Sequence, residues 1–521
     1  MKKIIISLLI VLTAGFSSCD WLDLAPVDNY SIDNYWNTKD QVDRFMRGLH
    51  NRVRSRQMTF LTMGEFRGGT LDMNLVSPFA QSKSDLEVIG NNLSVQNYGI
   101  AGFGSFYMDI MQINHAIEEI PTTNFLSEQE QNYYLGVLHG LRSFYYFHLF
   151  RTWGGVPLVD YPQVVEGVSS PEVLNKPRAS ESEIYDFIKK DIEKSYEYFA
   201  NDNFTLLAPD YASFWNKAAT NVLKAEVLLW GCKVKPIGGS AVYSDNIAAD
   251  LAAAKASLNE IERSSKFDML GNYSDVFDIN NKDNKEIIFS IRYALNEATN
   301  SFGGFLYPEG SGNANGFENR DGSLRYGDNE SPDPLNLTNS GSKYLYQYDF
   351  STFNMYEDAD SRRDVTFFDI YRRTNRSDVA ILLVKFLGEL DQSNYRRFTS
   401  DWPVYRYTDV LLLLAEIEEA QDNDPASYIN LVRQRAYGDA YETYKYPYNG
   451  ETAEDAILME RTKEFVAEGK RWYDIRRMKD GELAKALQIN VSGEKVEQHL
   501  LWPINADMIS RDPMIEQTPG Y

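Results

Sequence analysis

The sequence is poor in cysteine and histidine, and these shortages remove several classes of functional site. Cysteine occurs only twice in 521 residues, at Cys19 and Cys232. The five histidines stand in no His-Glu-x-x-His or similar zinc-binding spacing. No Walker-type phosphate loop and no Gly-x-Ser-x-Gly nucleophile motif is present. The sequence therefore gives no support for a catalytic zinc, a nucleotide-phosphate site or a serine hydrolase.

Positive charge and long apolar runs are also scarce. Lysine and arginine total 52 against 75 acidic residues, and the formal net charge is −23 at pH 7. So acidic a chain repels a phosphate backbone, which excludes a nucleic-acid partner. Apolar stretches beyond the N-terminus, such as Val410–Leu414, are too short to span a bilayer.

The first residues have the pattern of a bacterial lipoprotein signal. Lys2 and Lys3 precede the apolar run Ile4–Leu12, and small residues then lead to Cys19. The thiol of Cys19 is the group that can carry a diacylglycerol thioether, and several acyl chains make such an anchor stable. The alternative is a cleaved secretory peptide with a cysteine nearby by chance. The order of the three regions favours a lipid anchor at Cys19, and losing the two lysines would change the net charge from −23 to −25.

Helical periodicity dominates the rest of the chain. Apolar residues recur at three- and four-residue steps from Tyr407 to Ile417, and Asp424-Pro425 is typical of a helix start. Together they predict a helical hairpin over Val404–Tyr437, close to the 34-residue period of tetratricopeptide repeats. Further helices are predicted over Ser105–Ile120, Ser127–Arg151, Glu181–Ala200, Tyr211–Lys233 and Asp245–Ile261. The sequence therefore predicts a mainly α fold of stacked hairpins, with an irregular helical bundle as the alternative.

Two long segments lack a sustained period, residues 68–104 and residues 300–342. Loops of that length are usually functional or disordered. Both contain several aromatic residues, which a wholly disordered linker would have few of.

Short motifs in a fixed order resemble the SusD/RagB family of nutrient-binding outer-membrane lipoproteins, from Cys19 to Tyr521. The motifs that carry the resemblance are Trp21-Leu22-Asp23 and Tyr35-Trp36, then Tyr107, Ile110 and Asn114, Leu141-Arg142, Trp153-Gly154-Gly155-Val156-Pro157, Arg406-Tyr407, Glu468-Gly469-Lys470-Arg471, Asp474-Ile475-Arg476-Arg477 and the ending Gln517-Thr518-Pro519-Gly520-Tyr521.

The resemblance implies a signal peptide over residues 1–18 and one SusD-like domain over residues 19–521. It also implies a tetratricopeptide-like scaffold with a loop-rich ligand face, anchored at the cell surface on the outer membrane. The expected function is to bind an oligosaccharide or glycan and deliver it to a SusC-like TonB-dependent transporter barrel, without enzymatic activity. A peptide ligand remains an alternative.

Sugars present apolar ring faces edged with hydroxyls, so aromatic rings and hydrogen-bonding side chains in the two long loops are the candidate ligand contacts. The candidates are Asp72, Asn74 and Tyr98 in the first loop and Tyr307, Phe317 and Tyr326 in the second. These rings could instead pin their own loops. Neither loop contains tryptophan, which leaves a peptide or a small decorated glycan open.

A glycoside hydrolase is the enzyme alternative, because that reaction needs only two carboxylates. Glu460, Glu464 and Glu468, spaced four apart, are the most suggestive set. Nearby cations favour ion pairing as the better interpretation. These are Arg461, Lys463, Arg471 and Arg476.

Asp358, Asp360 and Asp364 could offer oxygen ligands to a calcium ion, although no EF-hand spacing is present. Arg362 and Arg363 among them favour local ion pairs instead. No cofactor is therefore predicted, and calcium is left as an open alternative.

Overall fold

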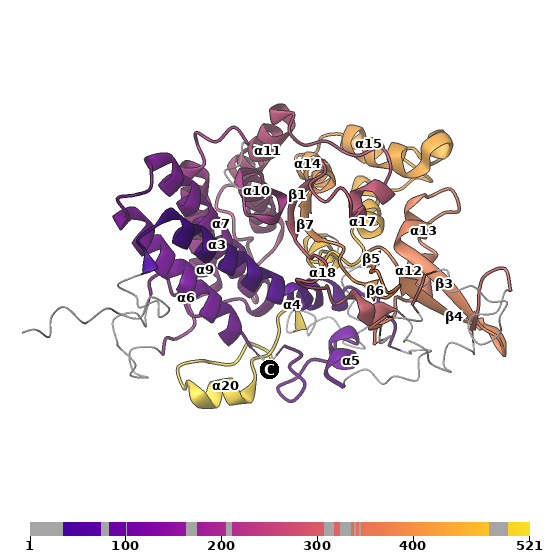
Figure 1. Cartoon of the computed structure of the whole chain (residues 1–521), viewed down its shortest axis with the longest axis horizontal. Helices are drawn as coiled ribbons and strands as arrows, with labels where there is room; N and C mark the ends of the chain where they lie inside the picture. Colours follow the sequence, from indigo (N-terminus) through magenta and orange to yellow (C-terminus); the bar gives the residue numbers. More distant parts are fainter. Residues whose placement is uncertain are drawn as a thin grey trace, which may run out of the picture.

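The computed structural model describes residues 35–73, 83–100, 102–162, 175–204, 211–306, 317–322, 335–337, 340–342, 345–478 and 499–521. About half of these residues are helical, and the strands are few and short (Figure 1). The helices of the first half are α3 (Lys39–Ser55), α4 (Gln57–Leu61), α5 (Lys83–Ile89), α6 (Gly104–Glu119), α7 (Glu128–Trp153), α9 (Glu181–Tyr198), α10 (Lys217–Lys233) and α11 (Ile247–Ser264). Those of the second half are α12 (Phe350–Phe353), α13 (Arg362–Thr366), α14 (Tyr407–Ala420), α15 (Ala426–Tyr437), α16 (Tyr441–Tyr444), α17 (Ala453–Glu464), α18 (Arg471–Arg477) and α20 (Ala506–Arg511).

The strands are short and antiparallel. They are β1 (Ile287–Ile291), β2 (Phe317–Glu318), β3 (Phe367–Arg372), β4 (Asn375–Leu383), β5 (Glu389–Leu390), β6 (Arg396–Arg397) and β7 (Trp402–Arg406). β1 pairs with β7, β3 lies between β2 and β4, and β5 pairs with β6. The β3–β4 hairpin projects at the lower right of Figure 1, away from the helical stack.

The helices pack as a continuous series. α6 contacts α7, α7 contacts α9, α9 contacts α10, and the series continues through α11, α14, α15 and α17. α7 is covered all round over most of its length, because every residue from Tyr134 to Trp153 is buried. A helix that is buried all round must be covered on every side by neighbours. The prediction of a mainly α, tetratricopeptide-like scaffold is confirmed.

A buried set of hydrogen-bonded side chains gives the motif residues Asn114 and Arg142 a structural role. Arg142 of α7 donates to Asp191 of α9 at 2.6 Å and to Asn114 of α6 at 2.8 Å. His139, one turn before Arg142, lies 2.7 Å from the same carboxylate. Buried charges need such partners, so this set joins three helices in one arrangement.

The structure corrects the hairpin predicted over Val404–Tyr437. Residues 404–406 are extended, since β7 pairs with β1, and the helix begins only at Tyr407. The second helix begins at Ala426, one residue beyond Pro425, which caps it. The first long loop also contains the short helix α5. Strand pairing over a long sequence separation leaves no local period, which is why the sequence did not reveal it.

The C-terminal segment packs against the N-terminal half. Arg67, after α4, donates to the carbonyl oxygens of His499 and Leu500, and its guanidinium lies 4.2 Å from the Trp472 ring. The backbone N–H of Trp502 donates to the carbonyl oxygen of Thr152 at 2.8 Å. One hydrophobic cluster accordingly contains residues from Val42 to Ile515.

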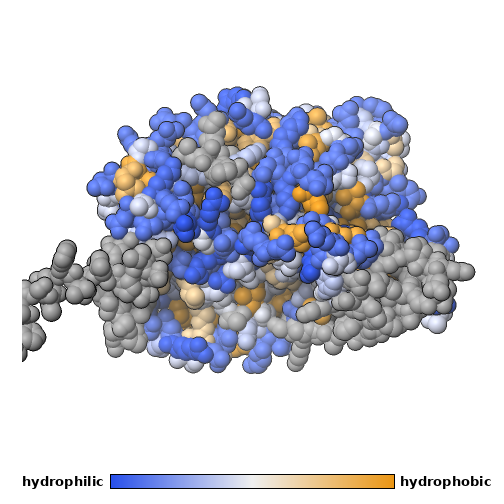
Figure 2. All heavy atoms as spheres, in the orientation of Figure 1, coloured by the Kyte–Doolittle hydropathy of each residue, from blue (hydrophilic) through white to orange (hydrophobic). Residues whose placement is uncertain are grey.

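Most of the surface in view is hydrophilic, and its hydrophobic residues lie in separate patches (Figure 2). Among the helices that the structure describes, none combines the length and apolar composition that a membrane crossing requires.

Close helix packing generates the first prediction. A Cβ added at Gly140 of α7 would lie 2.0 Å from Nε1 of the fully buried Trp215, whereas one added at Gly48 of α3 would meet nothing within 4 Å. We expect Gly140→Ala to lower the free energy of unfolding by about 1–3 kcal/mol through overpacking. The control Gly48→Ala should raise it by up to about 1 kcal/mol, because alanine favours the helix. Denaturant unfolding measures both, and equal effects would contradict this packing.

Candidate functional site

A cavity of about 440 Å³ opens beside the β5–β6 hairpin. Its walls combine three aromatic rings, two arginines and a glycine-rich segment. Its described lining residues are Met58, Thr299, Asn300, Ser301, Gly303, Gly304, Gly341, Leu345, Tyr346, Tyr395, Arg396, Arg397 and Phe398. Cavities of this size, with mixed apolar and polar walls, are typical of small-ligand sites.

The hairpin turn is shaped by Asp391. Its Oδ1 accepts the backbone N–H groups of Ser393 at 2.8 Å and Tyr395 at 3.0 Å, and its Oδ2 accepts Arg397 Nε at 2.9 Å. These bonds, with that from Tyr395 the main cause, lower the pKa of the Asp391 carboxyl. Asn394 takes the left-handed backbone conformation that closes the turn, with φ of +60°. The turn therefore presents Tyr395 and Arg397 in a fixed arrangement.

Tyr346 joins the two long loop regions at this cavity. Its hydroxyl donates to Asp85 of α5 at 3.2 Å, and its ring centroid lies 4.9 Å from Phe66 and 5.1 Å from Phe305. Burial, together with the negative charge of Asp85, raises the pKa of the Tyr346 hydroxyl. Residues of both predicted loops thus meet around one ring.

The sequence-predicted contact residues that the structure describes do not line this cavity, and the others lie outside the described part of the chain. The backbone N–H of Asp72 donates to the Gln347 carbonyl at 2.9 Å, and its carboxylate accepts Gln347 Nε2 at 3.4 Å. Tyr98 is half-buried, and its neighbour Gly99 packs against Trp502. Neither Asp72 nor Tyr98 lines the cavity. Cys19, Asn74, Tyr307, Tyr326 and the side chain of Phe317 lie outside the described residues.

Sequence reasoning missed Tyr346, Tyr395, Arg396 and Arg397. A signal for the last three was present, because the turn residues Asp391 to Asn394 precede the run Tyr-Arg-Arg-Phe. That pattern predicts a hairpin bearing aromatic and basic side chains. No comparable local signal marks Tyr346.

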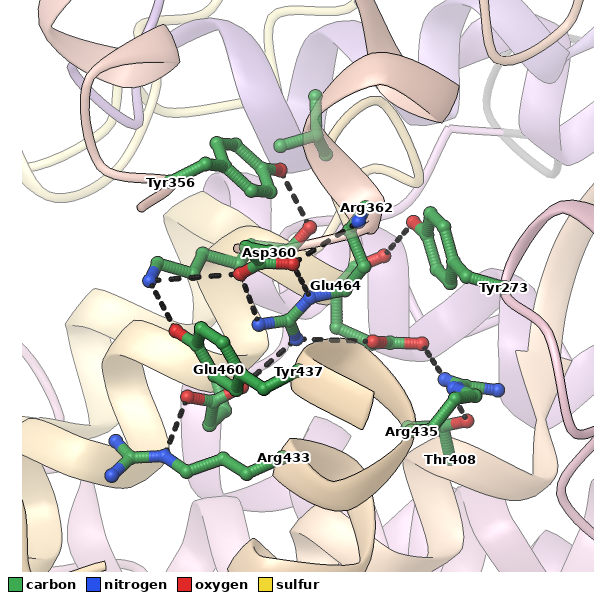
Figure 3. A network of polar contacts seen from close by, with 12 residues as sticks. Tyr273, Tyr356, Asp360, Arg362, Thr408, Arg433, Arg435, Tyr437, Glu460 and Glu464 are labelled. Atoms are coloured by element: carbon green, nitrogen blue, oxygen red, sulfur yellow. Dashed lines mark hydrogen bonds and ion pairs between the residues drawn. The ribbon is translucent and has the colours of Figure 1, made fainter. Parts of the chain in front are cut away.

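The three glutamates of the hydrolase alternative are buried in ion pairs rather than in a cleft. Figure 3 shows the part of this network around Glu460 and Glu464. Glu464 ends α17, and Glu468 lies beyond it, past a turn at Ala467 with φ of +62°. The three therefore do not share one helix face. Their partners are Arg362 and Arg433 for Glu460, Arg362, Arg406 and Arg435 for Glu464, and Arg406 and Lys385 for Glu468.

Ion pairing is confirmed, but the expected partners were wrong. Arg461 and Lys463 precede Glu464 on α17 but pair with other acids, whereas Arg471 and Arg476 follow the turn at Ala467. Their contacts are Asp474 at 2.9 Å for Arg461, Glu357 at 2.5 Å for Lys463, the Thr462 hydroxyl at 2.8 Å for Arg471 and the Arg151 carbonyl at 2.7 Å for Arg476.

The electrostatics of this network do not suit a general acid. Burial alone would raise the pKa of Glu464, but Arg435, Arg406 and Arg362 outweigh it and the pKa is lowered. A glycosidase acid needs the opposite shift. The cavity that reaches Glu468 measures about 30 Å³, far less than the cavity of about 440 Å³ beside the β5–β6 hairpin.

The aspartates of the calcium alternative are paired with arginines. Asp360 accepts Arg362 Nε at 2.9 Å and Nη2 at 2.7 Å, while Asp358 lies 2.7 Å from Arg363. Asp364 also pairs with Arg363, at 3.3 Å. Within the described ranges, no group of three histidine, cysteine or acidic side chains is arranged to hold a metal ion.

Comparisons with known proteins find similarity to the SusD family over both halves of the chain. A sequence model of the SusD family matches residues 285–521, and one described as starch-binding associating with outer membrane matches residues 20–223. The SusD-like protein P38 of Formosa agariphila is 25% identical, over 100% of this chain and 99% of its own. A solved SusD superfamily protein of Bacteroides fragilis is 34% identical with a TM-score of 0.81, covering 94% of this chain and 100% of its own.

One more distant solved structure was determined with a sugar. It is the surface glycan-binding protein A of Bacteroides thetaiotaomicron in complex with laminarihexaose. It shares 17% identity with a TM-score of 0.67, covering 93% of this chain and 100% of its own, a likeness that establishes a common fold.

The buried carboxyl of Glu65 should make stability depend on pH. Glu65 lies in the π-helical turn Thr62–Phe66, and its Oε1 accepts the Tyr348 hydroxyl and the Ala467 N–H, each at 3.2 Å. Its Oε2 is buried without a hydrogen bond among the described residues. Burial raises the Glu65 pKa from 4.5 to about 7, although those two bonds and the charges of Lys385 and Arg471 act against it.

We therefore expect the fold to favour protonated Glu65. The stabilisation it brings is complete below pH 4.5 and is lost as pH rises through about 7. Across that window, wild-type unfolding free energy should fall by up to about 3 kcal/mol relative to Glu65→Gln. Unfolding at a series of pH values measures this, with Glu118→Gln, an exposed site on α6, as the control. Parallel pH curves for wild type and Glu65→Gln would refute the buried neutral carboxyl.

Proposed function

The chain belongs to the SusD/RagB family, and on that premise we propose that it is an outer-membrane lipoprotein that captures a glycan and delivers it to a TonB-dependent transporter. The description of the matched N-terminal family points to association with the outer membrane. Surface glycan-binding proteins are among the relatives of known structure.

The observation that carries the glycan assignment is the cavity beside the β5–β6 hairpin. Tyr395, Tyr346 and Phe398 supply aromatic surface of the kind that covers a sugar ring. Arginine, asparagine, serine and threonine side chains in the same lining can orient hydroxyl groups. The predicted contacts Asp72, Asn74, Tyr98, Tyr307, Phe317 and Tyr326 extend this proposal to the surrounding loops.

We propose capture without chemistry. The acidic residues most suited to hydrolysis are committed to arginines, as Arg406 and Arg362 on Glu464 illustrate. The relative solved in complex with laminarihexaose is a glycan-binding protein by its description. A protein that only binds must pass its ligand on, which is the reason for a transporter partner.

The helical stack and the proposed lipid anchor fit a partnership with a transporter barrel. A stack of packed helices is stiff, so it can move as a unit about an anchored end. With Cys19 as the lipidated residue, the loop-rich face would close over the mouth of a SusC-like barrel and trap ligand between them. Neither the scaffold nor a lipid alone moves a solute across a membrane.

Glycan capture at the cavity predicts a specific loss of affinity. We expect Tyr395→Ala, in the full mature chain, to weaken binding of its best glycan about tenfold by removing stacking surface. Tyr441→Ala on α16, which packs against α15, is the matched control and should bind normally. Calorimetry against glycan and peptide panels, followed by product analysis, measures both points. A peptide as best ligand, or glycan cleavage that a single carboxylate mutation abolishes, would overturn the proposal.

Anchoring and partnership predict where the protein is found. Wild type should fractionate with outer membranes and co-purify, after mild detergent extraction, with a barrel of transporter size in equal amount. Cys19→Ala should move to the soluble fraction, because the acyl chains are lost. Membrane retention that survives this substitution would reject the anchor at Cys19. A protein that purifies alone, and whose deletion leaves glycan uptake unchanged, would reject the transporter role.

A further inference from the structure

We propose that the cavity selects glycan units that carry negative charge, as a carboxylate or a sulfate. This inference rests on the proposed glycan site and names its ligand class. Among the described lining residues, the charged side chains are Arg396 and Arg397, and none is acidic. A chain with a net charge of −23 thus places two cations at its candidate sugar site.

Arg397 is positioned to bind an anion. Its Nε donates to Asp391 Oδ2 at 2.9 Å, and its guanidinium lies 4.3 Å from the centroid of the Tyr395 ring. Its side chain is 43% exposed. Among the described residues, no protein group takes up its two Nη groups. An arginine fork held at one edge and over one face offers its other edge to two oxygens of a carboxylate or a sulfate in bidentate geometry.

Arg396 is held more deeply. Its Nη1 and Nη2 donate to the carbonyl oxygens of Gly388 at 3.3 Å and Leu335 at 2.8 Å. The residue is 8% exposed, so solvent screens its charge less than that of a surface arginine. Its positive charge therefore adds to that of Arg397 at the cavity wall.

Asp391 does not cancel this preference. Its carboxylate binds the Nε edge of Arg397 and the turn N–H groups, and it does not line the cavity. The hydrogen bonds that lower its pKa keep it ionised, so it remains a fixed counter-charge that orients the guanidinium. Ligand charge is then met by the Nη groups of Arg397 and by Arg396.

A second cavity gives a contrast within the same molecule. The cavity of about 300 Å³ between the start of α7 and the end of α9 is also lined by aromatic rings, among them Tyr133 and Tyr198. Its charged lining residues are Glu128 and Asp202, and no cation is among its described lining. An anionic sugar would be repelled there. A preference for negatively charged ligands would therefore arise at the cavity beside the β5–β6 hairpin.

The test uses the full mature chain carrying Cys19→Ala, with ligand pairs that differ in charge. The probes are trigalacturonate against its methyl ester, sialyllactose against lactose, and a sulfated galacto-oligosaccharide against its unsulfated parent. We expect the charged member of at least one pair to bind at least tenfold more tightly by calorimetry. The ligand pair whose charged member binds more tightly identifies carboxylate or sulfate as the recognised group. That preference should weaken as NaCl rises from about 0.05 M to about 0.5 M.

Arginine variants connect the preference to the cavity. Arg397→Gln should abolish the difference within the pair, and Arg397→Lys, which keeps the charge but loses the fork, should retain part of it. Arg44→Gln is the matched control, since Arg44 lies on α3 with 69% of its side chain exposed. Thermal unfolding checks that each variant folds, and if Arg397→Gln does not, Arg397→Lys carries the test.

Two failures are distinguishable. Neutral glycans that bind as tightly as their charged partners, with no effect of Arg397→Gln, would overturn the charge preference and leave glycan capture standing. Failure of every glycan to bind would overturn the proposed function itself.

Discussion

The buried ion-pair network around Arg406 is the constraint on which the rest of the structure depends. Arg406 is fully buried and contacts Glu286 at 2.8 Å, Glu464 at 3.0 Å and Glu468 at 2.9 Å. These acids come from the start of β1, the end of α17 and the turn that follows it. Charges so far from water are tolerated only with complete partner sets, and removal of one partner typically costs about 3–5 kcal/mol. The network thus requires sheet and helical stack to meet in one way.

The same network holds the base of the β5–β6 hairpin. Lys385 lies between β4 and β5, and its Nζ donates to Glu468 at 2.6 Å and to the carbonyl oxygens of Glu464 and Val466, each at 3.1 Å. Burial lowers the Lys385 pKa to about 8, with the charge of Glu468 acting in the opposite direction. The hairpin therefore emerges from a rigid base, with Tyr395 directly after its turn and Arg397 on β6 opposite Glu389. Rigid support for loop side chains suits specific binding.

Sequence reasoning succeeded where the information is local. The spacing that predicted the helices reflects residues three and four apart on one face, and α6, α7 and α11 appear within a few residues of their predicted bounds. The β1–β7 pair joins segments more than 100 residues apart and left no such period. The partners of Glu464 were missed for the same reason, because Arg362 and Arg406 are distant in sequence.

The candidate site was predictable in kind but not in place. Aromatic residues in the long polar segments pointed to loops, and Phe305 of the second segment packs on the cavity residue Tyr346. Which rings face a common space depends on how the two loop regions meet, and that is decided by contacts such as Tyr346 with Asp85. Such pairings across the chain cannot be read from either segment alone.

The packing of the C-terminal segment on the N-terminal half governs how the chain can mature. Arg67 finds its carbonyl partners at residues 499 and 500, and Thr152 finds the N–H of Trp502. A chain that emerges from a ribosome or a translocation channel with its N-terminus first presents these groups long before their partners exist. The helical stack can begin to form early, but the contacts of Arg67 and Thr152 are completed only when the last residues are available. Docking of the C-terminal segment, which places Trp502, Ile504 and Ile515 in the main hydrophobic cluster, is thereby the step that completes the core.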